Sequence, residues 1–322
     1  MRRAGRDRRG PPPPLAGGVP MPEVLKTVRA LLQAAAGWLE SRGVESARLN
    51  AERLLGDVLG LTRLELYLHH DRPVMEQEVG RFRDLLRRRG AGEPLQTLIG
   101  ETEFYSRTFK VERGVFVPRP ETETLVARGV ALLTETGGRP LAPSALDLCC
   151  GTGVVGVTLA AEVPALRVWA TDINEAAVRL TEQNAHRLGV APRLSALRGN
   201  LADPLPAHLA GTVDLLASNP PYVRRDEIQA LAREVAEHDP REALDGGPDG
   251  LAFHRALATL GRRWLRPGGW LAMEIGCDQG DDAVSLCRRA GFENVEVAAD
   301  LAGRPRVVTA RRPGATATGA GG

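Results

Sequence analysis

The sequence predicts an α/β protein in which a small bundle of helices precedes a mostly parallel sheet with helices on both faces. Three observations lead to this prediction. After residue 144, short apolar runs alternate with helical stretches, which is typical of a parallel sheet. Between residues 22 and 98, apolar residues recur at helical spacing. The 322 residues, 43% of them hydrophobic, are enough for two hydrophobic cores.

The overall charge and the cysteines narrow the class of protein. The formal net charge is +2, from 42 Lys and Arg against 40 Asp and Glu, and this balance does not indicate a dedicated nucleic-acid binder. The four cysteines form no C-x-x-C pair, and no His and Cys residues have metal-ligand spacing, so we expect no metal site and a reducing, cytoplasmic setting. The longest uncharged run, residues 148–161, is shorter than the roughly 20 residues of a membrane-spanning helix, so we expect no membrane association.

The ends of the chain differ in composition from the rest. Residues 1–20 are basic and proline-rich without the apolar core of a secretory signal, so we expect a disordered extension, and residues 313–322 are expected to form a disordered tail. Residues 21–98 are expected to form the helical domain. Its segment RFRDLLRRRG, residues 81–90, is basic; a solvated helix face is the simpler interpretation, and an RNA or ribosome contact is the alternative.

Residues 99–120 predict a β-hairpin connector. They hold two short β-like pieces, EFYSRTFKVE and GVFVP, separated by polar residues. The segment PRPETETLV follows, with Pro118 and Pro120 ahead of a helix whose first turn holds Glu121 and Glu123. Acidic groups in the first turn suit the helix dipole.

Residues 121–312 predict a seven-stranded sheet. The expected strands lie in ALDLCC, RVWATD, RLSALRGN, DLLASN, GWLAMEIG, VEVAAD and RVVTAR. The last two are joined by the short link LAGRP, and a parallel return would need a dozen or more residues. We therefore expect a mostly parallel sheet with one antiparallel strand near its edge.

The first strand runs into a glycine-rich turn, DLCCGTGVVG. Asp147 ends the strand, while Gly151, Gly153 and Gly156 shape the turn into a helix. Glycine lets the backbone approach a ligand closely, and the free N–H groups of a helix start favour an anionic group. Taken alone, such a turn also fits a plain link between a strand and a helix.

Asp172 ends the second strand, 21 residues after Gly151. This offset matches the roughly 20 residues at which an acidic side chain receives ribose hydroxyls in nucleotide-binding folds. The pairing predicts a bound nucleoside. The structural alternative is that Asp172 caps the helix that follows, and both roles can coexist.

The fourth strand ends in LLASNPPYV. Ligands in doubly wound sheets lie beyond the carboxyl ends of strands, so Asn219 is expected at the mouth of the same crevice. Pro220 and Pro221 lack N–H donors and must end the strand in a rigid loop. The Asn219 oxygen and the nearby carbonyls can accept hydrogen bonds, and Tyr222 offers a flat face, so the loop suits a planar NH₂ group. The alternative is a proline turn with an Asn cap.

The motif SNPPY, after a glycine-rich first strand and an acidic second strand, resembles the class I S-adenosylmethionine-dependent methyltransferases that modify planar nitrogens. Four further stretches resemble one branch, the release factor glutamine methyltransferases (the PrmC/HemK family): GEPLQTLIGETEFYSRTFKV, VPRPETE, ALDGGPDGL and DLAGRPRVV. The resemblance covers the chain from about Asn50 to Arg311. It implies a Rossmann-like fold, S-adenosylmethionine as methyl donor, and a glutamine in the Gly-Gly-Gln loop of a peptide chain release factor as substrate.

The resemblance also implies roles for individual residues. The cofactor would be held by Asp147, Cys149, Cys150, Gly151, Thr152, Gly153, Asp172, Asn200, Leu201 and Asn219. The substrate glutamine would be held by Asn219, Pro220, Pro221 and Tyr222, with Asn219, Pro220 and Tyr222 as the catalytic residues.

Two residues depart from the family pattern. Cys149 replaces the first glycine of the loop, which its small side chain allows provided that its φ is negative. Asn200 replaces a common acidic residue next to the expected adenine pocket; because an Asn can still accept a hydrogen bond from an adenine amine, we expect altered affinity and retained binding.

Three other functions compete with this interpretation. A glutamine methyltransferase of ribosomal protein L3 shares the chemistry, and DLCCGTG and EHDPREAL partly resemble that branch, whereas PRPETE favours the release factor branch. An adenine-N6 DNA methyltransferase would clamp a flipped base, but the near-neutral charge argues against a DNA-binding surface. A nucleoside-binding regulatory module without catalysis is disfavoured by the intact NPPY motif. We further expect a monomer whose helical domain recognises the protein substrate.

Overall fold

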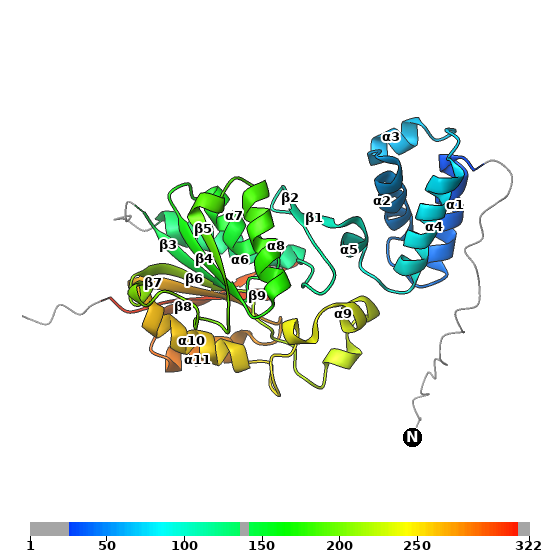
Figure 1. Ribbon diagram of the computed structural model, residues 1–322. Coiled ribbons are helices and arrows are strands. Elements are labelled where there is room, and N and C mark those ends of the chain that lie inside the picture. The colour runs from blue at the N-terminus through cyan, green and yellow to red at the C-terminus, as the bar shows by residue number, and fades with distance from the viewer. Residues whose placement is uncertain (1–25, 136–141, 315–322) are drawn as a thin grey trace, which may run out of the picture. The chain divides into compact units, whose positions relative to one another are not determined.

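The computed structural model describes residues 26–135 and 142–314 (Figure 1). The expected extension at residues 1–20 lies outside the described residues, as does most of the expected tail at 313–322. The chain divides into two compact units, Met1–Ala91 and Gly92–Gly322, so the division falls earlier than the expected boundary at residue 98.

The described part of the first unit is helical, as the apolar spacing predicts. Its helices are α1 (Val28–Glu40), α2 (Ala47–Leu59), α3 (Arg63–Leu68) and α4 (Glu76–Gly90). Leu31, Leu54 and Phe82, from the three longer helices, are fully buried. An added Cβ at Gly90 would lie 2.5 Å from the ring of Trp38, so only glycine lets α4 approach this side chain.

The basic segment of α4 does not form one solvated face. Arg87 and Arg88 are exposed, but Arg89 is only 8% exposed, and its Nε donates to Asn50 Oδ1 at 2.7 Å. Asn50 in turn donates from Nδ2 to the Glu45 carbonyl at 3.0 Å. Arg89 is therefore a structural residue that joins α4 to α2, because a buried guanidinium requires such partners.

The second unit contains the predicted seven-stranded sheet. Its strands are β3 (Ser144–Leu148), β4 (Arg167–Asp172), β5 (Leu194–Arg198), β6 (Val213–Ser218), β7 (Leu265–Glu274), β8 (Glu293–Ala299) and β9 (Pro305–Arg311). They lie in the order β5-β4-β3-β6-β7-β9-β8. The first five pair in parallel, and β9 is antiparallel to both of its neighbours. The predicted hairpin of the last two strands is confirmed.

Helices cover both faces of this sheet (Figure 1). They are α6 (Glu123–Glu135), α7 (Val154–Glu162) and α8 (Glu175–Arg187) on one face, and α10 (Ala252–Trp264) and α11 (Gly280–Arg289) on the other. Adjacent side chains of β6 point to opposite faces of the sheet: Leu215 packs into the core beneath α6 and α7, and Leu216 packs into the core beneath α10 and α11. Each such fully buried side chain contributes roughly 1.5–3 kcal/mol to stability.

The segment before α6 differs from the expected connector. The short helix α5 (Leu95–Ile99) precedes a hairpin of β1 (Glu101–Phe104) and β2 (Arg107–Lys110), which begins two residues before the first β-like piece, residues 103–112, and ends inside it. The expected strand in GVFVP is wrong, because Gly114 has φ +86° and the residues after it have no strand partner. Phe104 and Phe109 of the hairpin meet edge to face at 6.0 Å in the core of the second unit, so the hairpin is part of that unit.

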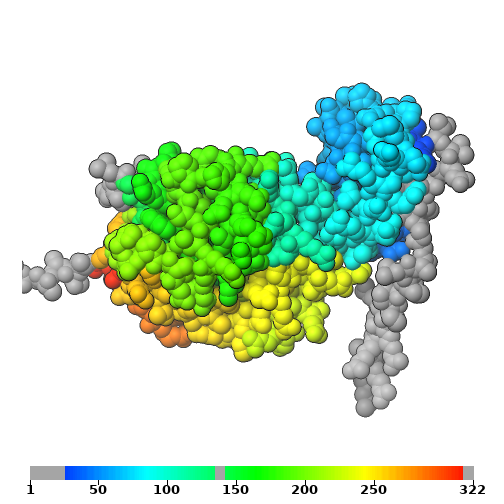
Figure 2. All heavy atoms as spheres, viewed as in Figure 1, coloured from blue at the N-terminus to red at the C-terminus, as the bar shows by residue number. Residues whose placement is uncertain are grey.

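Short segments complete the second unit. They are the 3₁₀ turns at Pro120–Thr122, Ala191–Arg193, Ala207–Leu209, Ile228–Ala230 and Arg241–Ala243, and the helix α9 (Arg233–His238). Residues between β6 and α10 form part of the yellow surface in Figure 2. Among the helices of the described residues, none has the length and apolar character needed to cross a bilayer.

Candidate active site

The glycine-rich turn follows β3, and the side chain of Asp147, near the end of that strand, hydrogen-bonds to its backbone. This side chain is 1% exposed, and its Oδ2 accepts the Gly156 N–H at 2.8 Å, while Oδ1 has no hydrogen-bond partner among the described residues. Burial raises the pKa of Asp147 to about 7. Gly153 has φ +78°, and an added Cβ there would lie 2.7 Å from Thr181, so the turn accepts only glycine at this position.

Cys149 adopts a conformation that the sequence did not predict. Its φ is +64°, so the expectation of a negative φ is wrong. The turn holds this residue in the left-handed conformation that glycine adopts most easily, which costs a residue with a side chain roughly 1–2 kcal/mol. The thiol contacts the Ser218 hydroxyl, and burial, with smaller contributions from Asp172 and Asp147, raises the pKa of Cys149 well above its usual range. Cys149 is therefore a neutral, strained part of the turn.

Asp172 connects the end of β4 to the glycine-rich turn. Its Oδ2 accepts the Gly151 N–H at 2.9 Å and its Oδ1 accepts the Asn174 N–H at 2.9 Å. The cap of α8 is Asn174, whose side chain accepts from the Ala176 N–H, so the alternative role of Asp172 as helix cap is wrong. Burial raises the pKa of Asp172, and hydrogen bonds from the backbone N–H groups of Asn174, Gly151 and Ile173 oppose this shift.

Asn200 and Leu201 follow β5 at the same edge of the sheet. Asn200 is exposed, and its backbone carbonyl accepts the Asp203 N–H at 3.0 Å. Leu201 has φ +47°, and its carbonyl accepts the Thr171 hydroxyl at 2.7 Å, which holds the segment against the end of β4. The turns after β3, β4 and β5 thus lie at one edge of the sheet, as the sequence predicts.

The loop after β6 begins where the double proline predicts. β6 ends at Ser218, whose hydroxyl donates to the Leu148 carbonyl at 2.5 Å and so joins the loop to the glycine-rich turn. Asn219 donates from Nδ2 to the Thr122 hydroxyl at 3.1 Å, which leaves its Oδ1 available to a ligand. Pro220 and Pro221 are buried, so the loop is fixed on the body of the unit.

The motif ALDGGPDGL supports the backbone of this loop. Val223 donates to the Leu244 carbonyl at 2.9 Å and accepts from Gly246 at 2.8 Å. An added Cβ at Gly246 would lie 2.8 Å from the backbone of Tyr222, and one at Gly250 would lie 2.5 Å from the Tyr222 carbonyl oxygen. These glycines allow two backbone segments to touch, which explains why the motif accompanies the NPPY loop.

Gln279 also supports the backbone of the NPPY loop. Its Nε2 donates to the carbonyls of Tyr222 and Gly250, at 3.0 and 3.3 Å, and its Oε1 accepts the Gly276 N–H at 2.9 Å. The side chain is 2% exposed. One buried amide therefore fastens the NPPY loop to the segment that follows β7.

Sequence reasoning did not single out Glu274, the last residue of β7. It is 1% exposed, and the Tyr222 hydroxyl donates to its Oε1 at 3.4 Å, while its Oε2 has no hydrogen-bond partner among the described residues. Burial raises the pKa of Glu274 to about 7, against the hydroxyl donors Thr122 and Tyr222 and the charge of Arg306. The sequence feature that could have identified Glu274 is its position as the single carboxylate at the end of the apolar run WLAME, at the carboxyl edge of the sheet.

The segments PRPETE and EHDPREAL meet at an ion pair. Arg119 Nη2 lies 2.6 Å from Asp239 Oδ2, and the Asp239 side chain is 1% exposed. A cavity of about 470 Å³ lies beside it; its lining residues are Ile228, Gln229, Leu231, Arg233, Ala236, Glu237, Asp239, Arg241 and Leu244. Asp239 is therefore a buried, fixed element of this surface.

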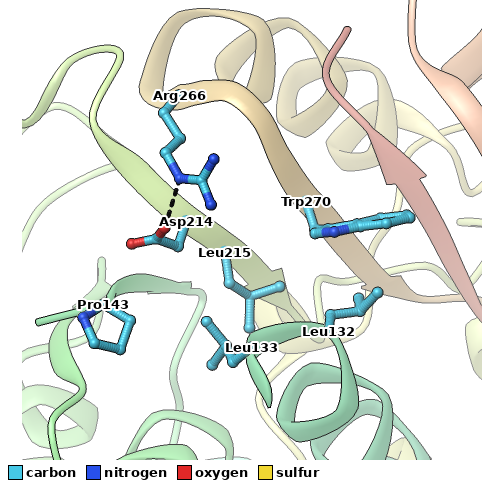
Figure 3. A pocket seen from close by; sticks show the side chains of 7 residues that line it. All are labelled: Leu132, Leu133, Pro143, Asp214, Leu215, Arg266 and Trp270. Carbon is cyan, nitrogen blue, oxygen red and sulfur yellow. Dashed lines mark hydrogen bonds and ion pairs between the residues drawn. The ribbon is translucent and has the colours of Figure 1, made fainter. Parts of the chain in front are cut away.

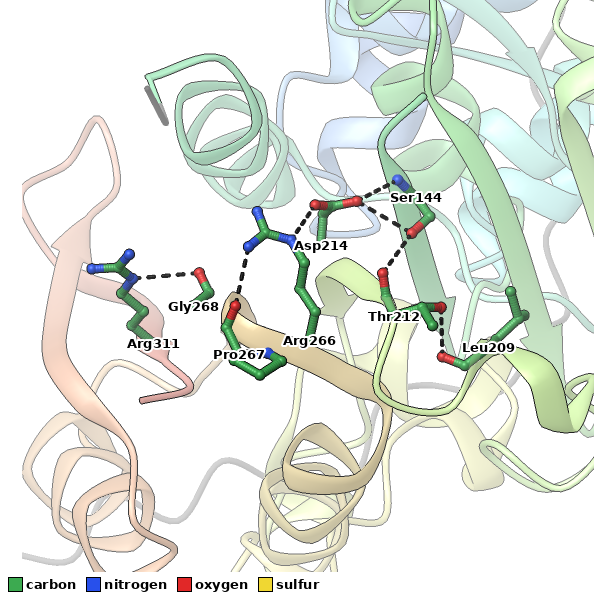
Figure 4. A network of polar contacts seen from close by, with 8 residues as sticks. All are labelled: Ser144, Leu209, Thr212, Asp214, Arg266, Pro267, Gly268 and Arg311. Atoms are coloured by element: carbon green, nitrogen blue, oxygen red, sulfur yellow. Dashed lines mark hydrogen bonds and ion pairs between the residues drawn. The ribbon is translucent and has the colours of Figure 1, made fainter. Parts of the chain in front are cut away.

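A second, much smaller cavity lies at the opposite edge of the sheet (Figure 3). Its volume is about 10 Å³, and Asp214 and Arg266 form an ion pair of 2.6 Å on its wall. Asp214 also accepts the Ser144 N–H at 2.8 Å, which ties together the starts of β3, β6 and β7 (Figure 4). This network is structural, because ligands of such sheets bind at the carboxyl ends of the strands. In the described residues, no group of His, Cys, Asp or Glu side chains could hold a metal ion.

Comparison with known proteins agrees with this geometry. Residues 30–100 match the PrmC N-terminal domain, and residues 107–248 match the methyltransferase small domain. The release factor glutamine methyltransferase of Geobacter sulfurreducens is 38% identical over 285 residues, which cover 88% of this chain and 96% of that relative. That of Cereibacter sphaeroides is 40% identical over 284 residues, covering 88% and 98%.

The chain belongs to the release factor glutamine methyltransferase family. A further member, from Mycobacterium tuberculosis, is 38% identical and is covered over 92% of its length. Among solved structures, the hMettl16 catalytic domain in complex with a 3′UTR hairpin superposes with a TM-score of 0.51 at 12% identity, over 65% of this chain and 76% of that one. This likeness concerns the fold alone and supports the predicted methyltransferase sheet.

Proposed function

We propose that this member of the release factor glutamine methyltransferase family transfers a methyl group from S-adenosylmethionine to the side-chain amide nitrogen of the glutamine in a release factor Gly-Gly-Gln loop. The observation that supports this most directly is Asn219, whose Nδ2 is committed to Thr122 while its Oδ1 is free to accept from a substrate NH₂ group. The curated relatives support the release factor as substrate, and no finding favours ribosomal protein L3 or DNA.

The residues at the ends of β3 and β4 fit S-adenosylmethionine. An added Cβ at Gly151 would meet no heavy atom within 4 Å, so there is open space above the turn. Asp147 and Asp172 place two carboxylates at this turn, which suits a ligand that carries a sulfonium and an ammonium group. We assign cofactor binding to residues at the carboxyl edge of the sheet, with Leu201 beside the adenine: Asp147, Cys149, Cys150, Gly151, Thr152, Gly153, Asp172, Asn200, Leu201 and Asn219.

The chemistry depends on orientation. S-adenosylmethionine supplies an electrophilic methyl group when bound. The lone pair of a glutamine amide nitrogen is delocalised into its carbonyl, so the enzyme must align this weak nucleophile. Asn219 Oδ1 and the Pro220 carbonyl accept the two amide hydrogens, and the Tyr222 ring packs against the amide plane. Holding the nitrogen in this way also stabilises the positive charge that develops on it, so no general base is needed before attack.

Labelled S-adenosylmethionine tests the proposal. The protein is incubated separately with a release factor, ribosomal protein L3 and DNA, and the labelled residue is located by mass spectrometry. We expect label on the Gly-Gly-Gln glutamine, and we expect Asn219→Ala to lose methyl transfer while cofactor binding stays measurable. Label on DNA or L3 alone would overturn the assignment of substrate, and substantial turnover by Asn219→Ala would overturn the role of the amide.

A further inference from the structure

The cavity beside α9 (the α9 cavity) is lined by the segment that follows the NPPY loop. Its volume of about 470 Å³ falls in the range of roughly 300–1,000 Å³ that ligand sites of proteins occupy. The apolar part of its lining has two buried and two half-buried side chains, which are Ile228, Leu244, Leu231 and Ala236. The exposed members of its polar part are Gln229, Arg233, Glu237 and Arg241. The cofactor and the substrate glutamine, as assigned above, leave this cavity unused.

Two links join the α9 cavity to the catalytic amide. On one side, Arg119 pairs with the lining residue Asp239 at 2.6 Å. Three residues after Arg119, the Thr122 hydroxyl accepts a hydrogen bond from Asn219 Nδ2 at 3.1 Å. On the other side, the carbonyl of the lining residue Leu244 accepts the N–H of the residue that follows the NPPY motif, at 2.9 Å. The α9 cavity therefore adjoins the place where the proposed function holds the substrate glutamine.

The charges in the lining leave one cation without a partner. Arg233 and Glu237 pair with each other at 3.0 Å, and Asp239 is already paired as described above. Arg241 makes no side-chain hydrogen bond or ion pair with another described residue. Its acidic neighbour Asp245 is held by a different arginine at 2.9 Å. A guanidinium has five N–H donors and no acceptor, so Arg241 suits a carboxylate beside the apolar part of the cavity.

We propose that the α9 cavity is a second binding site for the release factor, in which an apolar side chain of the factor enters the apolar lining and a neighbouring acidic side chain pairs with Arg241. The inference rests on the proposed function and adds to it a site that recognises the factor beyond its glutamine. Binding energy in protein interfaces is concentrated at buried apolar anchors and at arginines, and this cavity offers both. A nucleic acid would bring phosphates to one unpaired cation and four apolar side chains, which suits it poorly.

The test measures KM and kcat for a release factor at saturating S-adenosylmethionine. Arg241→Met removes the charge, and Ala236→Phe fills the apolar part of the cavity. We expect each change to raise KM roughly 10-fold, the size of effect of losing one charge-assisted contact or one buried anchor. We expect kcat to stay within about threefold of the wild type, because the residues that hold the glutamine are unchanged.

Matched controls make the same changes at the opposite edge of the sheet. Arg289→Met alters an exposed arginine in the last turn of α11, and Ala210→Phe alters an exposed alanine ahead of β6. Both controls should keep the wild-type KM. The cofactor dissociation constant and Tm should match the wild type in all four variants, which shows that they fold. A KM within about twofold of the wild type in either Arg241→Met or Ala236→Phe would overturn the inference.

Ionic strength gives a readout that a loss of structure would not move. Salt screens an ion pair with Arg241, so the wild-type KM should rise between about 50 and about 300 mM salt more steeply than the KM of Arg241→Met. Ala236→Phe keeps the charge and should keep the wild-type slope. Equal slopes for the wild type and Arg241→Met would contradict the pairing with a carboxylate.

Photochemical cross-linking identifies the occupant. A photoreactive benzoylphenylalanine in place of the exposed Gln229 should cross-link to the release factor, on a segment where an acidic residue stands beside an apolar one. A cross-link to a second copy of this chain, or none at all with a factor that is methylated, would overturn the inference. A wild-type protein that methylates no release factor would instead overturn the proposed function.

Discussion

Gly246 packs so closely against the NPPY loop that one added methyl group should slow methyl transfer. An alanine Cβ at this position would lie 2.8 Å from the Cα and carbonyl carbon of Tyr222 and from the Gly250 oxygen, whereas ordinary contacts begin at 3.4 Å. The loop must therefore move by roughly 0.6 Å, because backbone atoms cannot swing aside as a side chain can. Displacements of about 1 Å at a reacting group cost about 100-fold in rate. We expect Gly246→Ala to lower kcat by roughly 10- to 100-fold.

The assay measures kcat with a release factor and labelled S-adenosylmethionine, and cofactor binding by calorimetry. The cofactor dissociation constant should change much less than kcat, because the atoms nearest the added Cβ belong to Tyr222 and Gly250 and not to the turn after β3. Overpacking should also lower stability by about 1–3 kcal/mol. Gly280→Ala is the matched control, since its Cβ would meet only ordinary contacts of 3.7 Å or more. A Gly246→Ala variant with wild-type kcat would refute the link between loop position and catalysis.

Three other predictions concern the sheet and its turns. Cys149→Val should weaken cofactor binding and lower Tm, because a β-branched side chain is poorly tolerated at φ +64°. Cys149→Gly should keep cofactor binding and should not lower Tm, because glycine adopts this φ without strain; equal Tm values for the two variants would contradict the strain at this residue. Asp147 has a folded pKa of about 7 against a usual 3.8, so its burial lowers the free energy of unfolding of the wild type as the pH rises from about 4 to 7. Asp147→Asn should gain roughly 4 kcal/mol in free energy of unfolding relative to the wild type over that window, as measured by urea unfolding at pH 4 and pH 8; the same pH dependence in both proteins would contradict this. Arg266→Met leaves the buried Asp214 without its cation and should cost roughly 3 kcal/mol, while kcat below the unfolding temperature stays unchanged; a loss of kcat would give the opposite edge of the sheet a role in catalysis.

Much of this architecture follows from short-range patterns. Strand and helix alternation predicts the parallel sheet, and Pro220 and Pro221 predict the end of β6, because both depend on local hydrogen bonding and dihedral angles. The hydrogen bond from Asn219 to Thr122 joins residues 97 apart in the chain, and no local pattern encodes it. The positive φ of Cys149 is likewise imposed by the packing of the turn, against the preference of the residue itself.

The order of strands in the sheet differs from their order of synthesis. β8 precedes β9 in the chain, yet within the described sheet β8 pairs with β9 alone, and β9 fills the position beside β7. A growing chain that has emerged only as far as residue 299 therefore holds a strand with nothing to pair with and a β7 with an open edge. Arg306, which faces Glu274, lies on this last strand. A deletion that removes residues 305–311 should therefore leave both β7 and β8 without a pairing partner on this side of the sheet.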